Sequence, residues 1–172
     1  MTDEDVKKLC DCLSKNTTFV GELNLCSNSL TDLSGLYIAN AMKTFKGLKC
    51  LNLAKNNLHS KTAQYIGEVL INNPEYDIEE LNFKGNQLEE YGLRRLIAAT
   101  VANPHIKKLK LGIISDFGLD LLTTDLLNTS LVKLEFEEDA DHPFSERVRD
   151  RFVDAFKQGI ENAEDFTIEK IE

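Results

Sequence analysis

The clearest feature of the chain is a short pattern of hydrophobic and polar positions that recurs without gaps. Residues 22–30, 50–58 and 80–88 share one order of residues: a leucine at the second position, a polar residue, a second large apolar residue, an asparagine at the seventh position and a final leucine. Weaker copies occupy residues 108–111 and 133–136. Because side chains alternate between the two faces of a strand, each copy predicts a strand with one buried face.

The copies are evenly spaced, as structural repeats are. Their first leucines lie 28, 30, 28 and 25 residues apart, and they are Leu23, Leu51, Leu81, Leu109 and Leu134. After each strand, apolar residues follow at the spacing of a helix. The residues expected to face inward are Ala63, Ile66, Val69 and Leu70 in the second unit and Leu93, Leu96, Ile97 and Val101 in the third. Prolines at positions 74 and 104 should end these helices.

Both ends of the chain are predicted to cap the repeats. Residues 3–16 should form an amphipathic helix that starts at Thr2 or Asp3, and residues 145–163 a final helix that starts at Ser145. The inward residues would be Val6, Leu9, Cys10 and Leu13 in the first helix and Val148, Phe152, Phe156 and Ile160 in the last. Residues 165–172 either add a strand or lie along the cap. We therefore expect one domain over 1–172, a nearly complete solenoid with a cap at 1–16, repeats at 17–142, and a cap helix with an acidic tail at 143–172.

The repeated motif, L-x-L-x-x-N-x-L followed by a full helix, resembles the ribonuclease-inhibitor class of leucine-rich repeats over residues 17–160. The resemblance implies an α/β fold, a right-handed βα solenoid of about five units. Its parallel sheet would lie on the concave side and its helices on the convex side. Asn28, Asn56 and Asn86 match the asparagine ladder of the family, whose role is structural.

The last two units depart from this pattern. Ile114 stands at the ladder position of the fourth unit, and the chain there is about two residues short before Gly118. Asp139 stands at the ladder position of the fifth unit, within an acidic insertion at 137–141. We expect the regular arc to degrade in this region.

Composition and charge narrow the function classes. The 172 residues carry a formal net charge of −9. Residues 134–172 hold 13 acidic and 5 basic side chains, and this C-terminal excess is either a solvated face or a functional one. An acidic chain is a poor ligand for nucleic acid, and no apolar stretch approaches the ~18 residues of a membrane span. The polar N-terminus and the spacing of four cysteines, which favours free thiols, indicate a cytoplasmic protein.

The sequence offers no convergent set of catalytic residues, so we expect a protein that is not an enzyme and carries no cofactor. His59, His105 and His142 fall in three separate loops, and no motif for nucleophilic or phosphate chemistry is present. The run Glu137, Glu138, Asp139 and Asp141 could in principle collect a divalent cation, but it lacks the alternation of a calcium loop. We therefore expect no metal site.

Binding residues can be named from the strand alternation. The side chains beside the core leucines should form three exposed columns, which read Glu22, Cys50, Glu80, Lys108 and Lys133, then Asn24, Asn52, Asn82, Lys110 and Glu135, then Cys26, Ala54, Lys84, Gly112 and Glu137. These columns predict a face that changes from neutral, through a lysine cluster of Lys84, Lys108 and Lys110, to acidic. The alternative is that an exposed sheet face is simply polar. Tyr91 and Arg94, on the helix edge, belong to a second candidate surface, or Tyr91 is an ordinary packing residue.

We therefore predict a protein-interaction scaffold, an adaptor or regulator that binds a protein partner of unknown identity as a monomer. A second hypothesis rests on residues 128–136, which are similar to the end of the tropomodulin repeat domain. That family binds the pointed end of actin filaments, although its actin-binding arm has no counterpart in this sequence. A third possibility, direct enzyme inhibition, lacks the many-repeat horseshoe that it would need.

Overall fold

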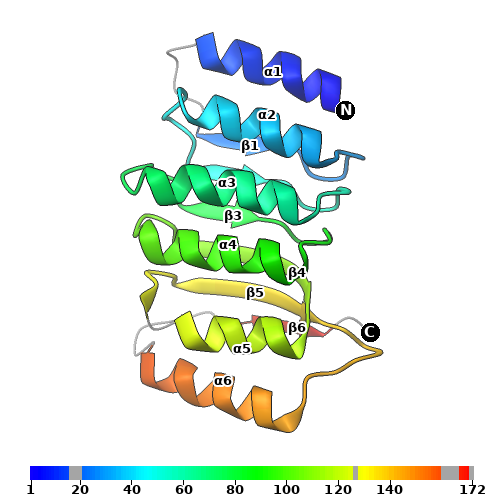
Figure 1. The fold of residues 1–172 in the computed structure, drawn as a ribbon, viewed down its shortest axis with the longest axis vertical. Helices are drawn as coiled ribbons and strands as arrows, with labels where there is room; N and C mark the ends of the chain where they lie inside the picture. Colours follow the sequence, from blue (N-terminus) through cyan, green and yellow to red (C-terminus); the bar gives the residue numbers. More distant parts are fainter. Residues whose placement is uncertain (16–20, 126–127, 160–166, 171–172) are drawn as a thin grey trace.

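The computed structural model describes residues 1–15, 21–125, 128–159 and 167–170, with side chains as far as Ala155. The elements alternate along the chain as α1 (Asp3–Lys15), β1 (Glu22–Asn24), α2 (Asp32–Met42), β2 (Cys50–Asn52), α3 (Ser60–Asn72), β3 (Glu80–Asn82), α4 (Glu89–Ala102), β4 (Lys108–Ile114), α5 (Asp116–Asp125), β5 (Lys133–Glu138), α6 (Glu146–Gly159) and β6 (Thr167–Lys170). The helices stack in one row and the strands lie behind them in a second layer (Figure 1).

The strands form one parallel sheet in the order β1-β2-β3-β4-β5-β6. The first leucine of each unit pairs with the first leucine of the next, from Leu23 through to Leu134. This register confirms the repeat alignment and the βα leucine-rich-repeat fold. The strand considered for the last residues also forms, since β6 pairs with β5.

The core lies between the sheet and the helix row. The strands contribute Leu51 and Phe83, and the helices contribute residues such as Ile66, all with no exposed surface. Each unit buries its apolar face against its neighbours, because one strand and one helix cannot enclose it alone. The prediction that Val101 faces inward was wrong, since its side chain is 42% exposed. The buried stripe of α4 passes through Thr100 instead, whose hydroxyl donates to the Ile97 carbonyl at 2.8 Å.

The first cap has the predicted start. Thr2 caps α1: its backbone N–H donates to the Asp5 carboxylate at 2.9 Å, and the Asp5 N–H donates back to the Thr2 hydroxyl at 3.3 Å. Val6, Cys10 and Leu13 are buried, and Leu9 is partly buried against the core.

The last cap also starts as predicted. Ser145 immediately precedes α6, and its backbone carbonyl accepts from the Val148 and Arg149 N–H groups. Phe152 is buried and Val148 packs against the core, whereas the side chains of Phe156 and Ile160 lie outside the described residues.

Carboxylates at helix starts link neighbouring helices, a feature that the repeat pattern did not predict. The Asp3 carboxylate accepts from the Thr31 N–H at 2.9 Å and from the Ser34 hydroxyl at 2.5 Å, at the start of α2. Asp32 does the same for α3, accepting from the Thr62 N–H at 3.0 Å and from its hydroxyl at 2.6 Å. A carboxylate is favourable at a helix N-terminus because it meets unpaired N–H groups and the positive end of the helix dipole.

The four cysteines carry free thiols. Cys50 pairs with Glu22 in the sheet, so Cys26 lies four positions beyond its neighbour, which agrees with the offset expected from the sequence. Burial raises the pKa of the Cys10 thiol to about 11. Among the described helices, none combines the length and the apolar character needed to cross a bilayer.

Candidate functional site

The ladder asparagines are structural, as the resemblance implied. Asn56 is 7% exposed. Its amide N–H groups donate to the carbonyls of Leu25 and Leu53, each at 2.9 Å, and its amide oxygen accepts from the N–H groups of Asn28 and Leu30, each at 3.2 Å. The residue before each ladder asparagine has positive φ, at 58° for Ser27, 54° for Lys55 and 65° for Gly85. One tight left-handed turn therefore follows each of the first three strands.

The predicted column of asparagines lies on the open face of the sheet. Asn24 is exposed, and Asn52 and Asn82 are half-buried. Each uses its amide oxygen in the same way, accepting from the backbone N–H two residues further on at 3.1 Å. The three residues thus share one local role.

The predicted lysines also lie on the open face, but nearby acidic residues compensate their charge. Lys110 Nζ lies 2.8 Å from Glu80, and Lys108 Nζ lies 3.8 Å from the same carboxylate. The side-chain hydrogen bond to Glu80 raises the pKa of Lys110. Glu135 lies 3.0 Å from Lys133 and 4.0 Å from Lys110, and Lys84 lies 3.5 Å from Glu137. The face is a pattern of alternating charges over β3, β4 and β5.

Three residues assigned to the exposed columns are buried. Glu135 is 9% exposed, since Lys110 and Lys133 reach over its carboxylate. Ala54 is 5% exposed, at the start of the turn that follows β2. Gly112 is buried because β4 contains an irregularity.

The irregularity is a one-residue bulge in β4. Lys110 pairs with Glu135 and Ile113 pairs with Glu137, so three steps along β4 match two along β5. A bulge shifts the following side chains to the opposite face. Ile113, which would otherwise face the core with Leu109 and Leu111, is therefore 55% exposed. A Cβ on Gly112 would approach the Asn86 carbonyl oxygen to 3.1 Å, so this glycine packs closely against the preceding turn.

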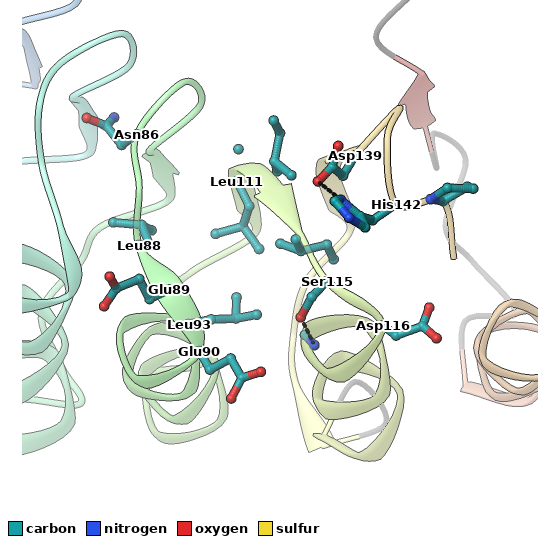
Figure 2. A pocket seen from close by; sticks show the side chains of 15 residues that line it. Asn86, Leu88, Glu89, Glu90, Leu93, Leu111, Ser115, Asp116, Asp139 and His142 are labelled. Carbon is teal, nitrogen blue, oxygen red and sulfur yellow. Dashed lines mark hydrogen bonds and ion pairs between the residues drawn. The ribbon is translucent and has the colours of Figure 1, made fainter. Parts of the chain in front are cut away.

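The bulge borders a pocket of about 650 Å³ at the edge of the sheet where the strands end. The fourth unit lacks the left-handed turn of its predecessors, because β4 stays extended to Ile114 and Ser115 alone separates it from α5. The space of the missing turn lies between the start of α4 and the loop after β5 (Figure 2). The pocket has an apolar floor, formed by Leu88, Leu93, Leu111, Ile113 and Ile114.

Acidic side chains surround this floor. The pocket lining contains Glu89, Glu90, Asp116 and Asp139, and among the described residues its only basic side chain is His142 (Figure 2). His142 Nδ1 lies 3.1 Å from the Asp139 carboxylate. The Asp141 N–H and then His142 lower the pKa of Asp139. Asp116 accepts from the Ser145 N–H at 2.9 Å, and hydrogen bonding by the Ser145 side chain and then by this N–H lowers the pKa of Asp116.

The helix-edge candidates lie on α4. The Tyr91 ring is 48% exposed, with the Arg95 guanidinium 5.5 Å from its centroid. Arg94 stacks at 4.8 Å on the ring of Phe117, which is 39% exposed. The exposure of Tyr91 speaks against the alternative that it is an ordinary packing residue, and the edge presents aromatic and cationic groups to solvent.

The remaining titratable groups do not converge. The three histidines are exposed and occupy separate loops, as the sequence predicts. The acidic side chains of residues 137–141 do not gather at one point either. Glu137 pairs with Lys84, and Asp139 contacts His142. The buried Glu138 pairs with Arg149 at 2.6 Å. Within the described part of the chain, no three His, Cys, Asp or Glu side chains come together as metal ligands.

Sequence reasoning missed the pocket, although part of its signal was visible. The shortened run before Gly118 and the isoleucine in place of the ladder asparagine both mark the position. The bulge that exposes Ile113 has no such signal, because alternation alone places this residue inward.

Two curated human proteins match the sequence. NACHT, LRR and PYD domains-containing protein 14 is 32% identical over 126 residues, which cover 72% of this chain and 11% of that protein. NACHT, LRR and PYD domains-containing protein 13 is 27% identical over 124 residues, which cover 71% of this chain and 12% of that protein. The chain thus spans only a small fraction of the length of these relatives. No family model matches the chain.

Among the solved structures that match, two cover about nine tenths of the chain. Leiomodin-1 actin-binding site 2 superimposes with a TM-score of 0.73 and 17% identity, covering 89% of this chain and 88% of that one. The tropomodulin C-terminal domain of Caenorhabditis elegans superimposes with a TM-score of 0.71 and 19% identity, covering 91% and 94%. At 17% and 19% sequence identity, this structural similarity establishes the fold alone. Together with the repeats, the ladder and the sequence relatives, it shows that the chain belongs to the leucine-rich-repeat family.

Proposed function

We propose that the chain is a non-catalytic protein-interaction scaffold, an adaptor or regulator that acts as a monomer in the cytoplasm. The observation that supports this function best is the open face of the sheet. The described helices lie in one row on the other side, so the outward side chains of β1 to β5 stay available (Figure 1). The four free thiols fit a reducing compartment.

The alternating charges on this face provide a basis for selectivity. A partner must place a cation near each exposed acid and an anion near each lysine, and a mismatched surface is repelled. Lys108 and Lys133 keep 48% and 30% of their side chains exposed, so they remain reachable despite their ion pairs.

The area of the face indicates that a partner contacts more than the strands. Six strands ~4.8 Å apart span ~24 Å, and with ~15 Å of strand length they offer about 360 Å². A standard interface buries about 800 Å² on each partner. The partner must therefore extend over an adjoining edge, and the pocket edge continues directly from Gly112 and Ile113.

A charge swap tests binding through the open face. The double variant Glu80→Lys with Lys110→Glu preserves an ion pair between the two positions but inverts the local charge pattern. Wild type and variant would be compared as baits in lysate, with bound proteins identified by mass spectrometry. We expect the variant to lose a partner that wild type retains, and circular dichroism would check that it is folded, because the swap also places like charges beside Lys108 and Glu135. If both baits retain the same proteins, the open face is not the binding surface.

A matched control is available at the other edge. The swap Lys49→Glu with Asp77→Lys likewise exchanges an ion pair, but it lies before the strands and away from the open columns. This variant should retain every partner of the wild type.

Actin binding is the second candidate function, and the whole-chain match to leiomodin-1 actin-binding site 2 favours it. Cosedimentation with filamentous actin, together with elongation assays on filaments capped at the barbed end, would test it. Slower pointed-end growth in the presence of wild type would support a tropomodulin-like role. Unchanged growth and no pelleting at micromolar concentrations would exclude it and leave the adaptor role.

A further inference from the structure

The pocket beside β4 lies where the repeating turn is first absent along the described strands. In the preceding units, the turn and its asparagine fill the space above the strand ends through hydrogen bonds between successive units. The ladder stops at Asn86, because Ile114 has no group that can continue it. The vacant space is thus bounded by an intact unit on one side and by the loop at residues 139–143 on the other.

The floor of this space is apolar, and part of it is open to solvent. Leu88, Leu93 and Ile114 are nearly buried, at 8%, 4% and 6% exposure, whereas Ile113 is 55% exposed as a result of the bulge. Binding of an apolar group over such a floor lowers the free energy, because it removes apolar surface from water. Its volume of about 650 Å³ lies within the usual range for ligand pockets, of the order of 300–1,000 Å³.

The charges around the floor differ from those on the open face of the sheet. On the open face, each lysine of the predicted cluster has an acidic neighbour. Among the described residues, Glu89, Glu90 and Asp116 form no ion pair with a basic side chain, and the pocket lining contains no lysine or arginine. The rim therefore carries a negative charge that the described part of the protein does not neutralise, which attracts cations and repels phosphates and anionic lipids.

We propose that this pocket binds a protein segment in which one or two apolar side chains are flanked by lysine or arginine. The apolar side chains would cover Ile113 and Leu88, and the flanking cations would approach Glu90 and Asp116. The inference rests on the proposed scaffold function and specifies one contact of the same partner, at the edge that the area argument requires. A basic–apolar segment matches both the apolar floor and the acidic rim.

Three synthetic peptides of about ten residues test the proposal with the full chain. The first has a pair of leucines flanked by lysines and arginines, the second has the same leucines flanked by glutamates, and the third has serines between the basic flanks. Affinity would be measured by fluorescence anisotropy. We expect the first peptide to bind at least about tenfold more tightly than either of the others, since a tenfold ratio needs only ~1.4 kcal/mol. High salt should reduce its advantage over the acidic peptide.

Two variants locate the binding. Ile113→Ser removes an exposed apolar group and should weaken the basic–apolar peptide about tenfold. Leu33→Ser is its matched control, because Leu33 on α2 is 54% exposed and distant in the fold. Glu90→Gln should weaken binding about threefold, a typical effect for an exposed charge. Glu4→Gln, another first-turn helix acid, should have no effect.

The results separate this inference from the proposed function. Equal binding of the basic and acidic peptides, wild-type affinity in Ile113→Ser, or no peptide binding would each overturn the pocket proposal. If a partner lost by the charge-swap variant still binds Ile113→Ser fully and is not displaced by the basic–apolar peptide, the scaffold function holds and the pocket inference fails. If wild type retains no specific protein at all, the scaffold function itself fails.

Discussion

At the scale of single residues, two sets of asparagines occur at fixed positions in every regular unit but differ in burial and in bonding. Asn24, Asn52 and Asn82 each hold one local hydrogen bond on the open face. Asn56 and Asn86 are buried, at 7% and 8% exposure, and bond to backbone groups of two successive units. Leaving buried backbone groups without a hydrogen-bond partner lowers the free energy of unfolding far more than the loss of one exposed hydrogen bond does.

We therefore predict that Asn56→Ala lowers the free energy of unfolding by about 2–4 kcal/mol, since it leaves buried N–H and carbonyl groups without partners. Asn24→Ala, at an exposed position with one bond, should cost less than about 1 kcal/mol. Urea denaturation followed by circular dichroism measures both. Equal midpoints for the two variants would contradict the structural role assigned to the ladder.

At the scale of elements, neighbouring helices approach through small residues near their starts. On α4, a Cβ at Gly92 would meet the Ser60 Cα of α3 at 2.8 Å and the Ala63 Cβ at 3.1 Å. The helix therefore has no room for a side chain on this face. Ala98, on the same helix, is exposed.

This contrast gives a second prediction. Gly92→Leu should destabilise the protein by about 2–4 kcal/mol, because overpacking must push α4 away from α3 and this cost exceeds the gain of ~1 kcal/mol in helix propensity. Ala98→Leu adds the same side chain to the exposed face and should change stability by less than about 0.5 kcal/mol. Thermal denaturation of the two variants distinguishes them, and a similar loss in both would disprove the close helix contact.

The elements were largely predictable because the repeat fixes them together. Once Leu23 to Leu134 are aligned, the strands, the helices and the parallel register follow, as do the buried positions of α3. The features that the sequence did not predict, the bulge in β4 and the ion pairs of the open face, depend on contacts between units. Alternation assigns Ile113 to the core and Gly112 to the surface, but a bulge exchanges them. The columns identified Lys108 and Lys110 without showing that Glu80, on the adjacent strand, lies within reach of both.

At the scale of the whole molecule, acidic side chains connect the ends of the solenoid to its body. Asp3 links α1 to α2, and Asp116 links α5 to the start of α6. Both carboxyl groups have lowered pKa values. For Asp3, burial is the largest single influence and raises the pKa, but the bonds from Ser34 and Thr31 together outweigh it. For Asp116, the bonds from Ser145 lower the pKa. The hydrogen bond from Lys49 likewise lowers the pKa of Asp77.

These directions predict a stability profile with a steep acid side. A carboxyl group whose pKa is lower in the folded state than the unfolded value of about 3.9 stabilises the protein fully above that value. The contribution is lost as the pH falls through the folded pKa, because the unfolded chain then binds more protons. Lys49 and Lys110 have raised pKa values, so their contributions are present below about 10.5 and are lost only at higher pH.

We therefore expect the urea midpoint to be nearly constant from about pH 6 to 8 and to fall steeply below about pH 4. Asp3→Asn should lower the plateau by about 0.5–1 kcal/mol, since the amide keeps an acceptor but loses the charge-assisted bonds, and should flatten the acid slope. Glu75→Gln, at an exposed loop residue, should reproduce the wild-type profile. Because Asp3 links α1 to its neighbour, hydrogen exchange in Asp3→Asn should accelerate first in α1. Uniform acceleration along the chain would instead mean that the cap and the repeats unfold as one unit.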